Sequence, residues 1–70
     1  MKQYYIEYRA SQYSHRATVV CAVCKATRQV IAERTHTTKL NNKDAVTSEV
    51  QMLAEWEGYT RTHEPTRKKF

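Results

Sequence analysis

The stretch Asp44–Thr60, DAVTSEVQMLAEWEGYT, decides the fold expected for this chain of 70 residues. Before it, apolar residues recur at every second position, and within it they recur at every third or fourth position. The second spacing is that of an α-helix, in which residues three or four apart share a face. One apolar stripe then runs along the helix and should face a sheet, and it is made by Val46, Val50, Leu53 and Trp56.

Residues that favour helix caps flank this stretch. The side chains of Asn41, Asn42 and Asp44 offer oxygen acceptors to the amides of a first helical turn, so we expect the N-cap within this group. Gly58 suits the left-handed conformation that ends a helix, and Pro65 prevents the helix from resuming. The helix should therefore end at about Gly58.

Toward the N-terminus, the segment Gln3–Arg9 shows the alternation of a half-buried strand. Successive side chains of a strand point to opposite faces of its sheet. The two faces of this strand then carry Tyr4, Ile6 and Tyr8 on one side and Tyr5, Glu7 and Arg9 on the other.

Two further strands are expected before the helix. After a polar loop at Ala10–Ser14, the β-rich run Arg16–Cys24 forms the second strand, in which Val19, Cys21 and Val23 share a face. Lys25–Arg28 is the expected hairpin turn. The third strand, Gln29–Thr38, is rich in Thr and β-branched residues, and its mixed polarity suggests the edge of a sheet.

The predicted fold class is α+β: a three-stranded antiparallel meander with one C-terminal helix packed on one face (β-β-β-α), followed by a basic tail. Residues 1–60 form a single domain, and residues 61–70 form the tail or a short extra strand. One helix cannot cover both faces of a sheet. We therefore expect an uncovered face that carries Tyr5, Arg9, Arg34 and His36 and that is exposed or covered by a partner.

Charge is sorted by segment along the chain. Residues 1–43 carry a net charge of +6, residues 44–60 carry −4 and residues 61–70 carry +3, which gives the overall +5. Phosphate would repel the acidic helix, so helix-based reading of a DNA groove is disfavoured. The basic strands, loops and tail are the expected contact surface for nucleic acid or another acidic partner. The candidate binding residues are Tyr5, Arg9, Arg16, Lys25, Arg28, Arg34, Lys39, Arg67, Lys68 and Lys69.

No pattern of residues indicates catalysis. The single glycine excludes both a Gly-rich phosphate loop and a Gly-flanked nucleophilic serine. Cys21 and Cys24 have the spacing of a zinc knuckle, but residues three apart in a strand point to opposite faces and a second such pair is missing. We therefore expect two buried thiols and no cofactor, with zinc at Cys21 and Cys24 as the alternative.

The order of the elements resembles the N-terminal half of ribonuclease H-like folds over about residues 3 to 58. A strand, a hairpin and the loop Leu40-Asn41-Asn42 lead into a helix that carries Thr47-Ser48-Glu49. In that family an acid on the first strand joins the helix Glu to hold magnesium. Here Arg9 stands near the place expected for that acid, Glu7 comes too early, and an acid from a fourth strand is absent. The resemblance implies a truncated, non-catalytic version, as in small antitoxin domains.

Size and composition favour a small binding protein over an enzyme. The chain contains no apolar run of the roughly 18 residues needed to span a bilayer, and Met1-Lys2-Gln3-Tyr4 is not a signal sequence. We expect a cytoplasmic protein without membrane contact, and its thin core makes a homodimer an option. Two functions are open: contact with nucleic acid or a nucleoprotein complex through a basic sheet face and tail, or inhibition or adaptation of a host protein by direct contact, as in phage-type modulators.

Overall fold

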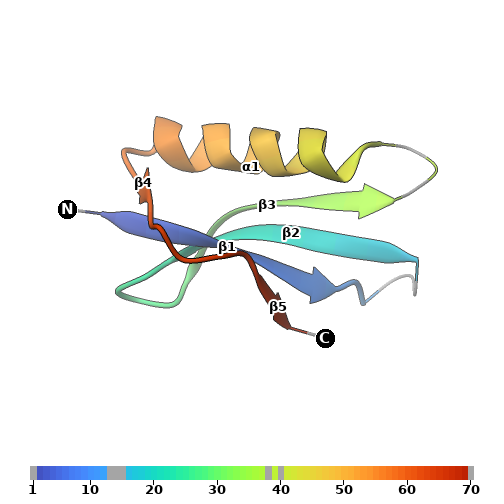
Figure 1. Cartoon of the computed structure of the whole chain (residues 1–70), viewed down its shortest axis with the longest axis horizontal. Helices are drawn as coiled ribbons and strands as arrows, with labels where there is room; N and C mark the ends of the chain where they lie inside the picture. The colour runs from blue at the N-terminus through green and yellow to red at the C-terminus, as the bar shows by residue number, and fades with distance from the viewer. Residues whose placement is uncertain (1, 13–15, 38, 40, 70) are drawn as a thin grey trace.

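Three antiparallel strands lead into one helix in the computed structural model, which describes residues 2–12, 16–37, 39 and 41–69. The elements are β1 (Gln3–Ala10), β2 (Ala17–Cys24), β3 (Val30–Thr37), α1 (Lys43–Trp56), β4 (Thr60–Arg61) and β5 (Arg67–Lys69). The predicted α+β class and β-β-β-α order are confirmed (Figure 1). Two predicted segment ends, Ser14 and Thr38, lie outside the described residues.

The strands of the described chain form one sheet in the order β3-β2-β1-β4, and β5 also pairs with β1. The β1–β2 and β2–β3 pairs are antiparallel. The last part of the chain, which we expected to be a tail or a short strand, runs parallel to β1 and pairs with it in two short pieces. Figure 1 shows this segment passing along β1 on its way to the C-terminus. Strand pairing therefore continues beyond residue 60.

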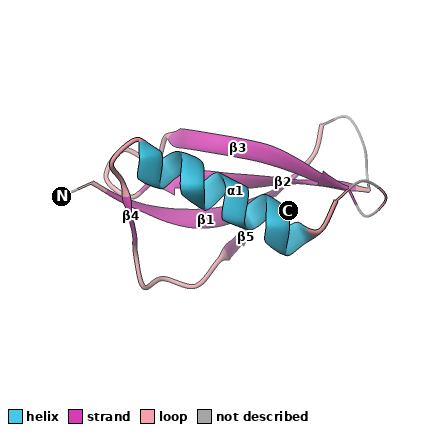
Figure 2. Ribbon diagram, turned by 90° about the horizontal axis from the view of Figure 1, so that it is seen from above, coloured by secondary structure: helices cyan, strands magenta, loops and turns pink. Residues whose placement is uncertain are grey.

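The helix packs across one face of the sheet (Figure 2). The buried residues on this helix-covered face are Tyr4, Ile6, Val20, Ala22, Val46, Val50 and Ala54. A second, smaller cluster on the other face, which we call the open face, consists of Tyr5, Cys21 and Val23 with Val19 packed against them. The alternation predicted for the first two strands is thus confirmed.

The predicted ends of the helix are confirmed, but part of its predicted stripe is wrong. Asn42 is the N-cap, and its side chain accepts a hydrogen bond of 2.7 Å from the Asp44 amide. Gly58 has the left-handed φ of 90°. Val46 and Val50 are buried, whereas Trp56 is 87% exposed. At 3.6 residues per turn, Trp56 lies about 120° around the helix from Val50, outside the buried row that Ala54 completes.

The predicted positions of Arg34 and His36 on the open face are wrong. Register pairs Arg34 with Val20 and His36 with Thr18, so both belong to the helix-covered face. Arg34 accordingly forms an ion pair with Glu49 of α1, with 3.0 Å between Nε and Oε1. Alternation alone cannot assign the faces of a strand, because a slip of one residue exchanges them.

Side chains cover much of the outer edge of β3. The Thr37 amide donates to Asn41 Oδ1 at 2.9 Å, Asn41 Nδ2 donates to the Thr35 carbonyl at 3.3 Å, and the Asn41 amide donates to the Thr37 carbonyl at 3.1 Å. Arg34 Nη1 donates to the Glu33 carbonyl at 2.8 Å. An added strand would need these same backbone groups, so the edge is protected against strand pairing.

Candidate functional site

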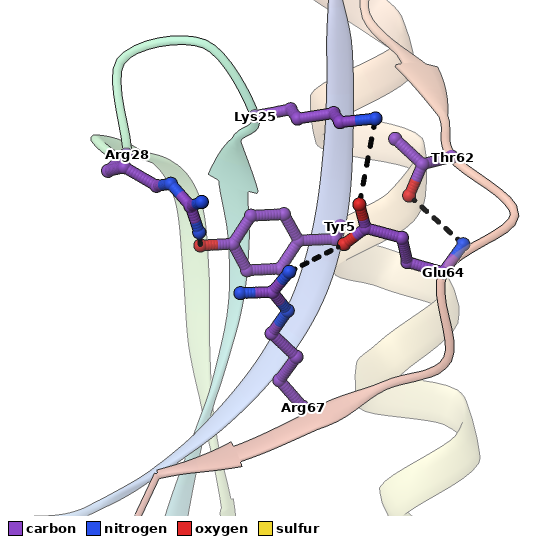
Figure 3. A network of polar contacts seen from close by, with 6 residues as sticks. All are labelled: Tyr5, Lys25, Arg28, Thr62, Glu64 and Arg67. Carbon is purple, nitrogen blue, oxygen red and sulfur yellow. Dashed lines mark hydrogen bonds and ion pairs between the residues drawn. The ribbon is translucent and has the colours of Figure 1, made fainter.

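Four of the predicted binding residues meet on the open face around one aromatic ring. Tyr5 is only 3% exposed, because guanidinium groups lie over it. The guanidinium carbon of Arg67 is 4.5 Å from the centre of the ring, and that of Arg28 is 5.8 Å away. Arg28 Nη1 also donates a hydrogen bond of 3.3 Å to the Tyr5 hydroxyl. Figure 3 shows these side chains together with Lys25, which approaches from the same turn as Arg28.

A tight hairpin turn brings Lys25 and Arg28 to this position. The Cys24 amide donates to the Gln29 carbonyl and the Arg28 amide donates to the Cys24 carbonyl, both at 2.8 Å. Arg28 has a left-handed φ of 64°, which is uncommon for a residue with a side chain. The Lys25 amide donates to the Gln3 carbonyl at 2.9 Å and so ties the turn to β1. These backbone contacts therefore hold the turn that carries Lys25 and Arg28 against β1, beside Tyr5.

One carboxylate completes this group of residues, which we call the Tyr5 cluster: Tyr5, Lys25, Arg28, Glu64 and Arg67. Glu64 Oε2 lies 2.9 Å from Arg67 Nη2, and Glu64 Oε1 lies 3.6 Å from Lys25 Nζ. Burial raises the pKa of the Glu64 carboxyl, but the hydrogen bond and charge of Arg67, with help from Lys25, outweigh it and leave the pKa below its ordinary value. The cluster holds three cations against one anion.

A second pair of charges lies beside the cluster on the same face. Glu7 is 6% exposed and accepts a hydrogen bond from Arg9 Nε. This contact neutralises Arg9, another predicted binding residue. Burial is the main reason that the pKa of the neighbouring Cys21 thiol is raised to about 11; the charges of Glu33 and Glu7 add to the rise, and the charge of Arg9 opposes it. Arg9 is therefore engaged with Glu7 on the open face, beside the buried Cys21 thiol.

A hollow of about 520 Å³ lies at the far end of the open face. Its lining is mixed in charge and polarity and consists of Arg9, Ala10, Ser11, Gln12, Val19, Glu33, Arg34 and Thr35. Arg9 is already bonded to Glu7, and Glu33 adds a negative charge. This mixture selects no ligand class as clearly as the Tyr5 cluster does.

The other predicted binding residues do not join the Tyr5 cluster. Arg34 is paired with Glu49 on the helix side, and Lys68 lies opposite Tyr8, a residue of the helix-covered face. Arg16 and Lys39 are exposed residues of the segments that precede β2 and α1. The side chain of Lys69 lies outside the described residues. The candidate site therefore contains four of the ten binding residues predicted from the sequence.

Sequence reasoning missed two features of the surface. It did not single out Glu64, although an acid among the bases of the last ten residues is a visible signal. It placed Trp56 in the core, whereas Met52 and Trp56 are 68% and 87% exposed on the outer side of α1. The spacing of Met52 and Trp56, one turn apart, indicates an apolar ridge on that side.

The two thiols of the Cys-Ala-Val-Cys segment lie on opposite faces. Register places Cys24 opposite Tyr4, a residue of the helix-covered face, whereas Cys21 belongs to the open face. Hydrogen bonds from the Thr27 hydroxyl and amide, with smaller ones from Ala26 and Tyr59, lower the pKa of Cys24. Opposite faces prevent both thiols from binding one ion. Within the described part of the chain, His, Cys, Asp and Glu side chains form no group of three that could hold a metal.

No protein-family model matches this chain, and neither the curated proteins nor the solved structures contain a significant match. Among the described residues, no helix is both long and apolar enough to cross a membrane.

Proposed function

We propose that this protein is a small non-enzymatic binding protein that contacts the phosphate groups of nucleic acid through the open face of its sheet. The observation that carries this proposal is the convergence of Lys25, Arg28 and Arg67 around Tyr5, with Glu64 as the single carboxylate of the cluster. Arginine guanidinium groups are the preferred partners of phosphate oxygens in proteins.

The distribution of charge supports one orientation on the nucleic acid. α1 carries Asp44, Glu49 and Glu55 against the single base Lys43, is followed by Glu57 and lies across the opposite face of the sheet. Phosphate would therefore attract the open face and repel the helix. Tyr5 is buried beneath two guanidinium groups, so it positions cations and does not offer its ring to a base. We expect contact that depends on charge and discriminates little between base sequences.

Glu7 and Glu49 are the acids considered in the comparison with ribonuclease H-like folds, and their positions give no support to catalysis. Glu7 lies on the open face and is bonded to Arg9, whereas Glu49 belongs to α1 and is bonded to Arg34. Because the sheet separates these two carboxylates, they do not face a common position for magnesium. In the proposed function, the chain is a non-catalytic version of that fold.

Titration of labelled single- and double-stranded oligonucleotides across salt concentrations tests the proposal. Three phosphate contacts predict a slope of about −2 to −3 in a plot of log affinity against log salt. Arg67→Gln should weaken binding more than Lys39→Gln, which removes the same charge from a residue outside the cluster. Affinity no better than millimolar at low salt, or equal losses for the two variants, would reject the Tyr5 cluster as a nucleic-acid site.

A second candidate function is contact with a protein through α1. Met52 and Trp56 form an exposed apolar ridge, and tryptophan is enriched among the residues that dominate binding energy in protein interfaces. Glu49 and Glu55 belong to the same helix, so the best complement is an apolar pocket with a basic rim. Affinity capture from the native host after nuclease treatment tests this function. A stoichiometric protein retained by the wild type and lost with Trp56→Ala would support it, whereas equal retention by both would count against it.

A further inference from the structure

We infer that the Glu64 carboxylate occupies a phosphate position in the Tyr5 cluster, and that a phosphate group of the ligand takes its place on binding. The inference rests on the proposed function and adds a regulatory element to the same site. It starts from the bridging geometry of Glu64. One of its oxygens meets Arg67 of β5 and the other meets Lys25 of the β2–β3 turn, at 2.9 and 3.6 Å (Figure 3). A phosphate group also presents several anionic oxygens that can bridge two cations.

The two arginines and the backbone of Lys25 would keep their positions if Glu64 moved away. The backbone of Arg67 pairs with Glu7 in the sheet, and its guanidinium group lies over the Tyr5 ring. The backbone of Lys25 is held by its amide contact with Gln3, and Arg28 is bonded to the Tyr5 hydroxyl. None of these contacts involves the Glu64 carboxylate. The position is thus preorganised for an anion.

The Glu64 side chain is held by two ion pairs that are partly exposed to solvent. Glu64 lies between β4 and β5, outside the paired strands, and its amide donates a hydrogen bond of 3.3 Å to Thr62 Oγ1. Its side chain is 30% exposed, and the side chains of Arg67 and Lys25 are 44% and 50% exposed. Ion pairs with this degree of exposure contribute little to stability. A rotation of the Glu64 side chain would therefore free both cations without opening the sheet.

The same geometry gives the expected direction of two substitutions. Glu64→Gln removes the competing charge, and Glu64→Asp keeps the charge but shortens the side chain by one methylene, so that it bridges the two cations less well. Both variants should bind phosphate more tightly than the wild type. We expect a gain of about three- to five-fold for Glu64→Gln, which corresponds to the loss of its two exposed ion pairs, with Arg67 and Lys25. The gain for Glu64→Asp should be smaller.

The matched control is Glu33→Gln. Glu33 pairs with Cys21 in the sheet and so lies on the same open face, but it belongs to the edge strand and not to the Tyr5 cluster. The substitution changes net charge by the same amount as Glu64→Gln. A larger gain for Glu64→Gln than for Glu33→Gln separates occupation of the site from a general effect of charge.

The experiment measures binding of inorganic tripolyphosphate and of a labelled single-stranded oligonucleotide to the wild type and to the three variants, with thermal unfolding as the check of folding. Tighter binding by both Glu64 variants than by Glu33→Gln supports the inference. Equal gains for Glu64→Gln and Glu33→Gln, with no gain for Glu64→Asp, overturn it and leave the proposed function standing.

The two probes distinguish failure of the inference from failure of the proposed function. If the wild type and the Glu64 variants bind no oligonucleotide, the proposed function fails. Tripolyphosphate binding that is stronger in the Glu64 variants would then still support an anion position occupied by Glu64. Failure of all four proteins to bind either probe would overturn both the inference and the proposed function.

Discussion

On the helix-covered face of the sheet, side chains from β1 and β2 pack against Val46, Val50 and Ala54 of α1. On the open face, Tyr5, Cys21 and Val23 form a smaller cluster, and Arg28 and Arg67 lie over the Tyr5 ring. Both faces bury residues of the same two strands to a similar degree. Their covers differ in kind: the first is the apolar side of an acidic helix, and the second includes Arg28 and Arg67 lying over an aromatic ring.

The difference shows how one small sheet can separate stability from binding. Long charged side chains bury their aliphatic stems against apolar groups while their charged ends stay near water. A cover of this kind protects Tyr5 and also presents cations to a ligand. The helix protects the other face with its apolar side and presents acids to the solvent, so it offers phosphate no attraction. We therefore expect the helix-covered face to dominate folding and the open face to dominate ligand contact.

The largest expected difference between the faces is in thiol reactivity. The pKa of Cys21 is raised to about 11 by burial, whereas hydrogen bonds lower the pKa of Cys24. At pH 8 the thiolate fraction of Cys24 should therefore be much larger than that of Cys21, and thiolate is the reactive form. Reaction with a thiol reagent, measured on Cys21→Ser and Cys24→Ser variants, should leave Cys24 as the fast site. Equal rates in the two variants would contradict the difference in pKa between the two thiols.

A matched pair of valines compares packing on the two faces. Val20 and Val23 are both fully buried in β2, on the helix-covered face and the open face respectively. Val20→Ala should lower the free energy of unfolding by about 2–3 kcal/mol, because the space left under the helix cannot close fully. Val23→Ala should cost about 1–2 kcal/mol, because the cluster on the open face is smaller and no helix holds its surroundings in place. Urea unfolding measures both values, and an equal or larger cost for Val23→Ala would refute the comparison.

A smaller effect on stability is expected at the outer edge of β3, where both faces of the sheet end. Asn41→Ala removes two side-chain hydrogen bonds to the backbone of β3 and should lower the free energy of unfolding by about 1 kcal/mol. It also uncovers backbone groups that can pair with another strand, so light scattering should show more self-association than in the wild type. Asn41→Asp keeps the acceptor for the Thr37 amide and should give an intermediate result. Unchanged association in Asn41→Ala would mean that Asn41 does not protect the edge.

The smallest expected effect comes from the outer side of the helix. Trp56 is 87% exposed, so Trp56→Ala should change the free energy of unfolding by no more than about 0.5 kcal/mol. Val50→Ala on the inner side of the same helix is the control and should cost several times more. A large loss of stability in Trp56→Ala would restore the stripe predicted from the sequence.

The sequence predicted the elements well and the site only in part. Alternation in β1 correctly separated Tyr4 and Ile6 from Tyr5. The group predicted to hold the N-cap contains the actual cap, Asn42, and Gly58 was correctly placed at the end of the helix. The faces of β3 were wrong, because alternation within a strand does not reveal its register with a neighbour. Of the ten predicted binding residues, Tyr5, Lys25, Arg28 and Arg67 meet in one cluster.

The amino-acid sequence by itself determined where the strands and the helix lie, because periodicity and capping depend on residues close together in the chain. It also determined the separation of charge between the helix and the rest of the protein. Only the tertiary structure decided that Glu64 bridges Lys25 and Arg67 and that Trp56 lies outside the core. These features depend on the register of β1 with the C-terminal segment and on the rotation of α1 over the sheet, and neither is specified by local spacing.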